Sequence, residues 1–390
     1  MTTSVVVVSH LAHEWLEPCL MSVVGQADEV ILVDNGSRSG SVAAAGHRAG
    51  VRVESVASNR GFAAGVNIGV RRAKGDVVAL LNDDAVAGPG WLASSEEALQ
   101  DKTVAAVGPK VLFSSPFVEI HLEQTPHYAP PDKRPLGRMI GKVEVAHREL
   151  PLASLRGPGL HGVEHGEWDG RTADFRWTAG SGAIYVPLAH SDAVCEVIVD
   201  DQPVPATRIV DLISCAGSYL SARGHGGDYG FGAVDDGRFD RSAERFGTTG
   251  AAMVVRAETF AEVGEFVESF FLYYEEFDWC WRARLAGMRL LYEPSAVIRH
   301  VGGVTTGRSA ANSVRFLAAR NRIHTLARNA PVRELATEIR SRVDRPESGM
   351  RLPLATRAAI GLLERRSLAK HWARSPTQVW EDWAGRDEQW

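Results

Sequence analysis

Carboxylates follow two of the apolar runs in the sequence, at the point where each run ends. Asn82-Asp83-Asp84 follows the run at residues 77–81, and neighbouring acids at a strand end could bridge a divalent cation to a diphosphate. Asp34-Asn35-Gly36-Ser37 follows another run, where Asp34 could accept hydrogen bonds from a base or a ribose. Taken alone, each motif is at least as typical of a capped turn.

A third segment is both acidic and aromatic. Tyr273-Tyr274-Glu275-Glu276-Phe277-Asp278 places three carboxylates at a predicted helix start, where the helix dipole favours negative charge and one of them could act as a general base. Adjacent positions on a helix diverge by about 100 degrees, so Glu275 and Glu276 cannot both face one reacting group. Matching of negative charge to the helix dipole explains the cluster equally well.

Two further signals are weaker. Residues 59–69, which begin Asn59-Arg60-Gly61, are spaced by glycine and predict a helix start whose N–H groups, with Arg60, could face a phosphate. The spacing is neither GxGxxG nor a P-loop, which disfavours ATP- or NAD-type cradles. His300 precedes Val301-Gly302-Gly303 after a predicted strand, and a lone histidine is more often structural than a ligand.

These residues need an α/β scaffold to bring them together. Short apolar runs rich in β-branched residues lie at 5–8, 29–34, 51–57, 77–82 and 104–112, with helix-like segments between them. The alternation predicts βαβ units and a parallel sheet. Ser9-His10, Asp34 and Asp83-Asp84 would then gather at one edge, where such sheets bind ligands.

The alternation stops near residue 113 and returns near residue 247. Strand-like pieces are predicted at 175–186, 194–199 and 206–213, with a hairpin turn at Asp200-Asp201-Gln202-Pro203. We therefore expect four regions: 1–112, an inserted β-rich domain at 113–212, a second part of the core at 213–304, and a basic helical region at 305–390. In the insertion, Trp168, Trp177 and Tyr185 are expected in a core, with sugar contact or oligomerisation as alternatives.

Composition bounds the class of protein. The 390 residues are 45% hydrophobic and 23% charged, which excludes a disordered or collagen-like polymer. Four cysteines without a CxxC pair argue against a disulfide framework or a zinc knuckle, so a reducing cytoplasm is expected. No apolar run approaches the roughly 20 residues of a membrane span, and no nucleic-acid partner is expected. The net charge of −5 combines an acidic body with a basic region after Thr305.

Seven segments, in order, resemble family 2 glycosyltransferases and are most similar to their rhamnosyltransferase-like branch. They are residues 5–9, 33–37 (Val-Asp-Asn-Gly-Ser), 59–67 (Asn-Arg-Gly-Phe-Ala-Ala-Gly-Val-Asn), 80–84 (Leu-Leu-Asn-Asp-Asp), 250–256, 270–278 and 300–303. The resemblance covers residues 4–112 and about 213–304. It implies a GT-A fold, Rossmann-like in its nucleotide-sugar half at 1–112, with the acceptor and catalytic half at 213–304. It also implies an inverting, metal-dependent transfer from a nucleotide-diphosphate sugar.

The resemblance also implies roles for particular residues. The donor-binding set comprises Ser9 and Asp34 at the nucleoside, Asn59 and Asn67 on the base and ribose side, and Asp83 near the ribose or sugar, together with Arg60, Gly61 and Asn82. The metal, Mn²⁺ or Mg²⁺, falls to Asp84 and His300. The catalytic set is Glu276 as base, with Glu275 and Asp278 beside it. Glu276 stands where the family usually has Asp, and Asn82 stands at the first position of the DxD-type motif.

The expected function is therefore transfer of a sugar from a dTDP- or UDP-sugar, with dTDP-rhamnose favoured by similarity alone. The acceptor hydroxyl would belong to a glycan, a lipid-linked molecule or a small molecule, in glycan, cell-envelope or glycoconjugate biosynthesis. Because the extra methylene of Glu276 shifts the base by about one bond length, an impaired nucleotide-sugar-binding protein is one alternative. A nucleotidyltransferase is the other.

The basic region raises the question of a membrane. A helix over residues 312–329 would place Phe316, Ile323 and Leu326 toward one side, with Arg315, Arg320, Arg322 and Arg328 around them. Such a helix could lie on the anionic inner face of the membrane, as a peripheral contact of a cytoplasmic protein. The alternative is that it packs its apolar side on the catalytic body and leaves a solvated arginine face.

Overall fold

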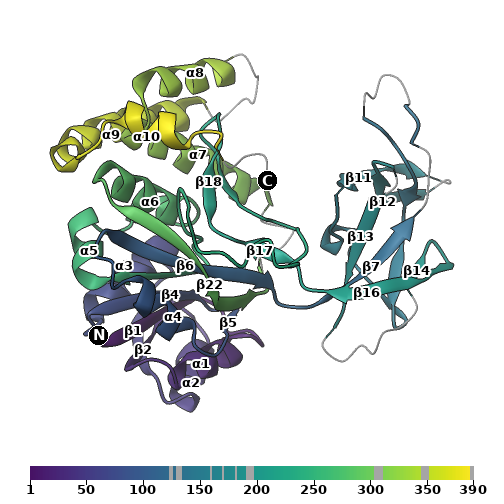
Figure 1. Ribbon diagram of the computed structural model, residues 1–390, viewed down its shortest axis with the longest axis horizontal. Helices are drawn as coiled ribbons and strands as arrows, with labels where there is room; N and C mark the ends of the chain where they lie inside the picture. Colours follow the sequence, from purple (N-terminus) through teal and green to yellow (C-terminus); the bar gives the residue numbers. More distant parts are fainter. Residues whose placement is uncertain are drawn as a thin grey trace. The chain divides into compact units, whose positions relative to one another are not determined.

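The computed structural model describes residues 1–122, 126–128, 134–158, 160–168, 171–180, 182–189, 197–302, 311–343 and 351–386. The chain divides into two compact units. Unit 1 comprises Met1–Leu112, Cys215–Phe231 and Gly237–Trp390, and unit 2 comprises Phe113–Ser214 and Gly232–Asp236. Figure 1 shows the helices and central sheet of unit 1 and the smaller sheets of unit 2.

Unit 1 begins with the predicted βαβ units. The strands are β1 (Thr3–Ser9), β2 (Glu29–Asn35), β3 (Arg52–Val56) and β4 (Val77–Asn82), and the helices between them are α1 (Leu16–Val24), α2 (Ser41–Arg48) and α3 (Phe62–Arg72). β1 pairs in parallel with β2 and with β4, and β2 pairs in parallel with β3. The register puts Ser9 beside Asp34 and Val8 beside Asn82, so three strand ends meet at one edge.

The rest of the sheet is not parallel, which corrects the prediction. β21 (Ala252–Arg256) runs antiparallel to β4, starting opposite Leu81, and also pairs with β6 (Val104–Phe113). The strand order is β20-β22-β6-β21-β4-β1-β2-β3, with β5 and β17 off this path. The chain re-enters the sheet at the edge where β4 ends, so β21 must run in the opposite direction. The other bounds are β5 (Ala85–Ala87), α4 (Trp91–Ala98), β17 (Ile213–Cys215), β20 (Ala243–Glu244), α5 (Ala257–Val263) and β22 (Arg289–His300).

Alternate side chains of the strands face two apolar layers, as the period of a strand requires. On one face Val5, Val7 and Leu32 pack with Leu16 and Leu20 of α1. On the other face the strands pack against α3, α5 and α6 (Glu275–Leu285), through a cluster that includes Val6, Ile31, Val33, Val66, Phe260 and Trp279. Both faces of the sheet are therefore covered by helices.

Unit 2 is built from antiparallel strands. One sheet joins β7 (Phe117–Leu122), β13 (Gly182–Pro187) and β16 (Ala206–Val210), and a second joins β11 (Leu160–Trp168), β12 (Arg171–Thr178) and β8 (Met139–Ile140). The third contains β9 (Val143–Val145), β10 (Arg148–Glu149), β14 (Val197–Val199) and β15 (Gln202–Val204). Buried side chains of all three sheets, including Val118, Ile140, Val145 and Val197, form one hydrophobic cluster.

The predicted strands of this region were partly wrong. Residues 175–186 form two strands in different sheets, β12 and β13, rather than one. Asp200-Asp201 does form a hairpin turn, with φ of +48° and +61°, but it joins β14 to β15 rather than to the strand at Ala206. Tyr185 is buried and Trp177 is half-buried against the Phe175 ring. The Trp168 side chain, residues 194–196 and Gly303 lie outside what the structure describes.

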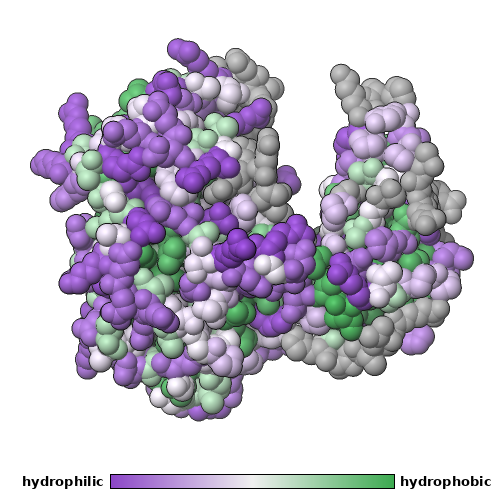
Figure 2. Space-filling view, in the orientation of Figure 1, coloured by the Kyte–Doolittle hydropathy of each residue, from purple (hydrophilic) through white to green (hydrophobic). Residues whose placement is uncertain are grey.

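The C-terminal helices belong to unit 1. They are α7 (Ala311–Asn329), α8 (Val332–Val343), α9 (Arg351–Leu368) and α10 (Pro376–Trp383). Leu326, Trp380 and Trp383 pack against Phe277 and Trp281 of α6 in one cluster. The visible face of these helices is largely hydrophilic (Figure 2).

Two of the four arginines that the membrane hypothesis used, Arg322 and Arg328, are not on a free basic face, whereas Arg315 is exposed. Arg322 pairs with Glu338 of α8, and Arg328 pairs with Asp278 of α6 and Glu364 of α9. Both side chains are buried, and the carboxylates that they contact balance their charges. The apolar side of α7 does pack on the body of unit 1, as the alternative expected, since Leu326 lies against Phe277 and Trp281. Its arginine face is solvated only in part, because Arg322 and Arg328 are buried. Among the described residues, no helix is long and apolar enough to cross a bilayer.

Candidate active site

Asp84 and His300 meet at the edge of the sheet although they lie far apart in the sequence. Asp84 follows β4, and His300 is the last residue of β22. His300 Nε2 lies 3.0 Å from Asp84 Oδ1, and the Gly302 N–H donates to Asp84 Oδ2 at 3.1 Å. Antiparallel pairing of β22 with β5, in the register His300 to Ala85, fixes this approach. The carboxylate of Asp84 and the imidazole of His300 are therefore in direct contact at the edge of the sheet.

Two more side chains extend this cluster. His13, in the loop after β1, places Nε2 3.2 Å from Asp83 Oδ2, and the hydrogen bond and charge of that carboxylate raise the pKa of His13. The Asn82 amide lies 3.4 Å from His300 Nε2. His13 was not predicted, although its position four residues beyond a strand end is the signal that could have found it.

Asp84 and His300 are the residues of this cluster that could hold a divalent cation. Within the described ranges, no three His, Cys, Asp or Glu side chains are placed to hold a metal. Cations that serve phosphate chemistry, however, take one or two protein carboxylates and complete their shell with phosphate oxygens and waters. The Asp84 carboxylate with the His300 nitrogen beside it fits an ion that is shared with a diphosphate.

The expected nucleoside side occupies the same edge. Ser9 is buried, and its hydroxyl donates to the Leu11 carbonyl at 3.3 Å. Asp34 Oδ1 accepts the Ser37 N–H at 2.9 Å, so the Asx turn forms and one carboxylate oxygen is used in it. Ser9 and Asp34 lie side by side with Asp83 on the neighbouring strand end, which the sequence alone could only suggest.

The glycine-spaced segment is held internally rather than offered to a phosphate. Asn35 Oδ1 accepts the Arg60 N–H at 3.1 Å, and Asn59 Oδ1 accepts the Gly61 N–H at 2.8 Å. The Arg60 guanidinium pairs with Glu268 at 3.1 Å. The N–H groups of Arg60 and Gly61 are therefore used inside the protein, and the segment shapes the wall beside Asn35. The Arg60 side chain is half exposed and lies in a surface ion pair.

Asn67 is a clearer correction. Its side chain is completely buried, and its amide exchanges two hydrogen bonds with the Phe266 backbone, at 2.9 and 3.0 Å. Because both polar atoms are satisfied inside the protein, Asn67 cannot contact a nucleotide. It joins α3 to the segment before residues 268–270.

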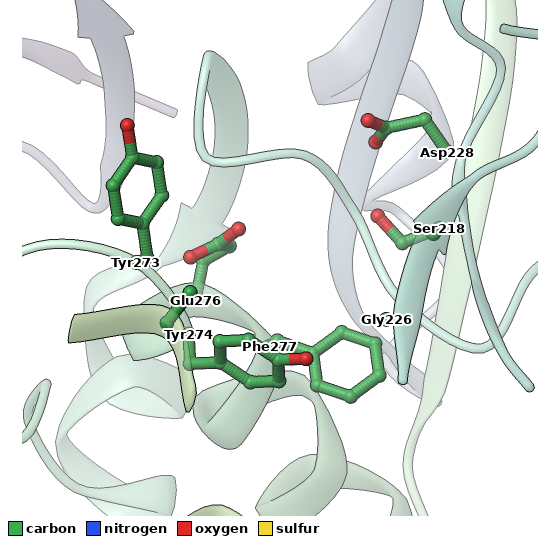
Figure 3. Close-up of a pocket in the computed structure, with 9 residues that line it drawn as sticks. Ser218, Gly226, Asp228, Tyr273, Tyr274, Glu276 and Phe277 are labelled. Carbon is green, nitrogen blue, oxygen red and sulfur yellow. The ribbon is translucent and has the colours of Figure 1, made fainter. Parts of the chain in front are cut away.

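Glu276 lies in a cavity of about 220 Å³. The lining residues come from β18 (Ser218–Leu220), β19 (Gly226–Asp228), the start of α6 and α7, and they are Ser218, Gly226, Gly227, Asp228, Tyr273, Tyr274, Glu276, Phe277 and Ala318. In the view of Figure 3, the Glu276 carboxylate lies between Tyr273 on one side and Asp228 and Ser218 on the other. The cavity is therefore aromatic on its walls and carries two carboxylates.

The surroundings of Glu276 suit a general base. Burial and the nearby Asp228 carboxylate raise the pKa of Glu276 to about 7. A base with a pKa near the operating pH combines an available deprotonated form with a useful affinity for the proton. A Cβ built on Gly250 would lie 3.1 Å from Glu276 Cδ, so the absence of a side chain there leaves room for the glutamate.

The other two members of the predicted catalytic set do not reach the cavity. Glu275 is 3% exposed and does not line it, and burial together with Glu276 raises the pKa of Glu275 well above its usual value. Asp278 is completely buried and accepts hydrogen bonds from Arg282, Arg328 and Asn329 at 2.8–2.9 Å. Burial opposes ionisation of Asp278, but Arg328 and Arg282 outweigh it and lower its pKa. The helix geometry turns the Glu275 side chain away from the cavity. The Asp278 carboxylate is already bound by Arg282 and Arg328.

Several cavity residues were not predicted individually. Asp228 lies in the glycine-rich stretch 226–230, a segment that the resemblance expects to border the donor sugar and the acceptor, although it assigns Asp228 itself no role. Ser218 and Ala318 carry no local signal, because only tertiary packing brings them to Glu276. Sequence reasoning can find residues at the ends of strands more readily than residues delivered by distant helices.

The chain is similar to known proteins in sequence over part of its length and in fold. Residues 4–155 match the model of Glycosyl transferase family 2, and no curated protein matches the chain. Among solved structures, GalNAc-T7 with UDP, GalNAc and Mn²⁺ superposes with a TM-score of 0.56 and 14% identity, over 98% of this chain and 56% of that one. This chain thus spans little more than half the length of that protein.

Two other solved structures have lower TM-scores. The mannosyltransferase PcManGT from Pyrobaculum calidifontis, with GDP-Man and Mn²⁺, has 14% identity and a TM-score of 0.42, over 95% of this chain and 83% of that one. Glucosyl-3-phosphoglycerate synthase from Mycobacterium tuberculosis, with Mn²⁺, UDP and phosphoglyceric acid, has 21% identity and a TM-score of 0.26, over 28% and 43%. The GalNAc-T7 likeness shows a GT-A fold.

Proposed function

We propose that this protein is a metal-dependent, inverting glycosyltransferase that moves a sugar from a nucleotide-diphosphate donor to an acceptor hydroxyl. The observation that carries the proposal is the connection between the two clusters. The Asn82 N–H donates to the Ala251 carbonyl at 2.9 Å, and neighbouring Gly250 lies against Glu276. A single dipeptide thus separates the strand that delivers Asp83 and Asp84 from the carboxylate in the cavity.

The residues have distinct roles in this reaction. Asp84 and His300 would hold the divalent ion, which supplies positive charge to the departing diphosphate. Glu276 Oε takes the proton of the acceptor hydroxyl as its oxygen bonds to the anomeric carbon. The bond between that carbon and the phosphate oxygen breaks from the opposite side, so the nucleoside diphosphate leaves and the configuration inverts.

The cavity restricts the acceptor. Its lining combines two carboxylates, Asp228 and Glu276, with the rings of Tyr273, Tyr274 and Phe277, and no basic side chain lines it among the residues that the structure describes. An anionic group near the reacting hydroxyl would be repelled by these carboxylates. We therefore infer an uncharged hydroxyl-bearing acceptor, such as a sugar unit of a glycan. The donor we favour is a dTDP- or UDP-sugar, with dTDP-rhamnose first, on resemblance alone.

A nucleotide-sugar panel tests the proposal. The protein is incubated with Mn²⁺, one of dTDP-rhamnose, UDP-glucose, UDP-galactose or GDP-mannose, and a set of neutral p-nitrophenyl glycosides. We expect acceptor-dependent release of nucleoside diphosphate and a product of inverted anomeric configuration. Glu276→Gln serves as the matched inactive control. Release of pyrophosphate instead would indicate a nucleotidyltransferase, and donor binding without turnover would indicate an impaired binding protein.

A further inference from the structure

The backbone immediately before the proposed base is strained. Phe271 has φ +68° and ψ −58°, and the Leu272 N–H donates to the Phe270 carbonyl at 2.8 Å. This is the rare form of the γ-turn. Tyr273 and Tyr274 follow with φ of +71° and +74°, so three non-glycine residues within four adopt a conformation that L-residues seldom populate. Such strain persists only when the surroundings enforce it.

The strained turn is held by one side chain of α7. Asn321 is 1% exposed, and its Nδ2 lies 2.9, 2.9 and 2.8 Å from the carbonyl oxygens of Phe270, Leu272 and Tyr273. Its two amide hydrogens are thus shared among three acceptors. All three acceptors belong to the strained turn, so the contacts of Asn321 stabilise the backbone conformation of the whole turn.

Arg320 orients the Asn321 amide. Arg320 Nε donates to Asn321 Oδ1 at 3.0 Å, which leaves Nδ2 directed at the turn. The same guanidinium donates to the Ser269 and Phe270 carbonyls at 2.9 and 2.8 Å. An amide rotated by half a turn would place its oxygen against the carbonyls, and Arg320 opposes that rotation.

The turn lies between the start of α3 and the cavity. On one side, the Phe271 carbonyl accepts the Phe62 N–H at 2.6 Å, at the start of α3. On the other side, Tyr273, Tyr274 and Glu276 line the cavity. Beyond Glu276, Arg328 and Asn329 of α7 bind Asp278. The helix α7 therefore fixes the chain both before and after the base.

We propose that Asn321 is a positioning residue of the transferase, whose side-chain amide holds the strained turn at residues 270–274 so that Glu276 faces the cavity. The inference rests on the proposed function and adds a requirement for α7, which lies outside the residues that match the family. Without the three contacts the turn relaxes toward negative φ, and each relaxed dihedral rotates the start of α6. A displacement of about 1 Å at a reacting group costs about a hundredfold in rate.

The decisive variant is Asn321→Asp, which keeps the shape and replaces the donor with an oxygen that repels the three carbonyls. We expect kcat for nucleoside diphosphate release, with the donor and glycoside found in the panel above, to fall about a hundredfold. The KM for the donor stays unchanged. Thr325→Val is the matched control, because Thr325 is equally buried on α7 and its hydroxyl has no hydrogen-bond partner among the described residues. This control keeps the wild-type rate.

The pH profile separates positioning from a structural role. The titratable groups near Glu276 are Asp228 of β19, Tyr274, and Glu275 and Cys280 of α6. If the turn relaxes, Glu276 leaves this environment and the acidic limb of kcat/KM moves below the wild-type value. A variant that merely unfolds more easily keeps the same limb and the same kcat per folded molecule, and that result would overturn the proposal.

Two further measurements keep the inference testable. Should Asn321→Asp fail to fold, Arg320→Met frees the amide to rotate and is expected to lower kcat about tenfold, with the same shift of the acidic limb. In the protein without any ligand, hydrogen exchange of the Leu272 N–H is expected to accelerate in these variants and not in Thr325→Val. Unchanged exchange refutes the proposal, whereas absence of turnover in the wild-type protein refutes only the proposed function.

Discussion

The two parts of the site are built in different ways. The donor rim, which we define as Ser9, His13, Asp34, Asp83 and Asp84, is delivered by the ends of three neighbouring strands. The acceptor cavity around Glu276 is assembled from β18, β19, the start of α6 and α7. Backbone ladders fix the rim, whereas side-chain bonds to a strained turn fix the cavity. The rim should therefore tolerate changes to distant side chains that the cavity does not.

The carboxylates of the rim and of the cavity also differ in their pKa values. Burial would raise the pKa of Asp84, but the hydrogen bond and charge of His300 hold it below its usual value. Glu276 has a second carboxylate, Asp228, nearby, and its pKa rises to about 7. One carboxylate thus stays charged and ready for a cation, and the other is ready to accept a proton.

The largest effect is expected in the cavity. Glu276→Gln is nearly isosteric and removes proton transfer, so kcat should fall by about 10²–10⁴-fold while donor affinity stays nearly intact. Steady-state kinetics and calorimetric titration of the nucleoside diphosphate measure the two quantities. Glu275→Gln is the control and should be nearly silent. If Glu275→Gln is the damaging change instead, the assignment of the base is off by one residue.

A change at the rim should affect rate and binding together. Asp84→Ala removes a carboxylate that would hold the cation, so turnover should fall by about 10²–10³-fold. Donor affinity should also weaken, and addition of Mn²⁺ should no longer strengthen it. Titration with UDP in the presence and absence of Mn²⁺ measures this. Wild-type affinity that still responds to Mn²⁺ in the variant would place the metal elsewhere.

The contrast in pKa predicts opposite effects on stability. Because the folded pKa of Glu276 lies above the ordinary value of 4.5, the stability that its protonated form contributes is complete below that value and lost as pH rises through 7. Glu276→Gln should therefore raise the free energy of unfolding by about 3 kcal/mol at pH 8, and by less than about 1 kcal/mol at pH 5.

Asp84→Asn is the counterpart, because the folded pKa of Asp84 is lowered and its charge stabilises the protein above the ordinary value. This variant should be less stable than the wild type at pH 8, with the difference shrinking in acid. Urea denaturation at both pH values measures each variant. Changes of the same sign in both would show that the two carboxylates do not differ in the way described here.

What the sequence could predict follows the same division. The strands of residues 1–112 are short apolar runs whose ends carry Asp34 and Asp83-Asp84. Such runs can be recognised from neighbouring residues alone, so these strands could be predicted from the sequence. The closure of Asp84 on His300 came from the resemblance, since no local pattern specifies that the end of β22 pairs with β5, directly after Asp84. Asp278 was misassigned because its partners Arg328 and Asn329 lie on a helix some 50 residues away. The role of Asn67 was missed for the same reason, because only tertiary structure places it against Phe266.

The smallest effect on rate should come from unit 2, since no candidate side chain of either rim or cavity lies in it. Its strands have their own hydrophobic cluster, and the Phe113 N–H donates to the Leu212 carbonyl at 3.0 Å, so the entering and leaving chain are adjacent. A short Gly/Ser linker in place of residues 115–210, with Leu212→Ser to avoid an exposed leucine, should leave kcat within about twofold. Nucleoside diphosphate release and UDP binding measure the two halves of the site separately. Loss of turnover with intact UDP binding would mean that unit 2 contacts the acceptor, whereas loss of both would mean that it completes the fold of unit 1.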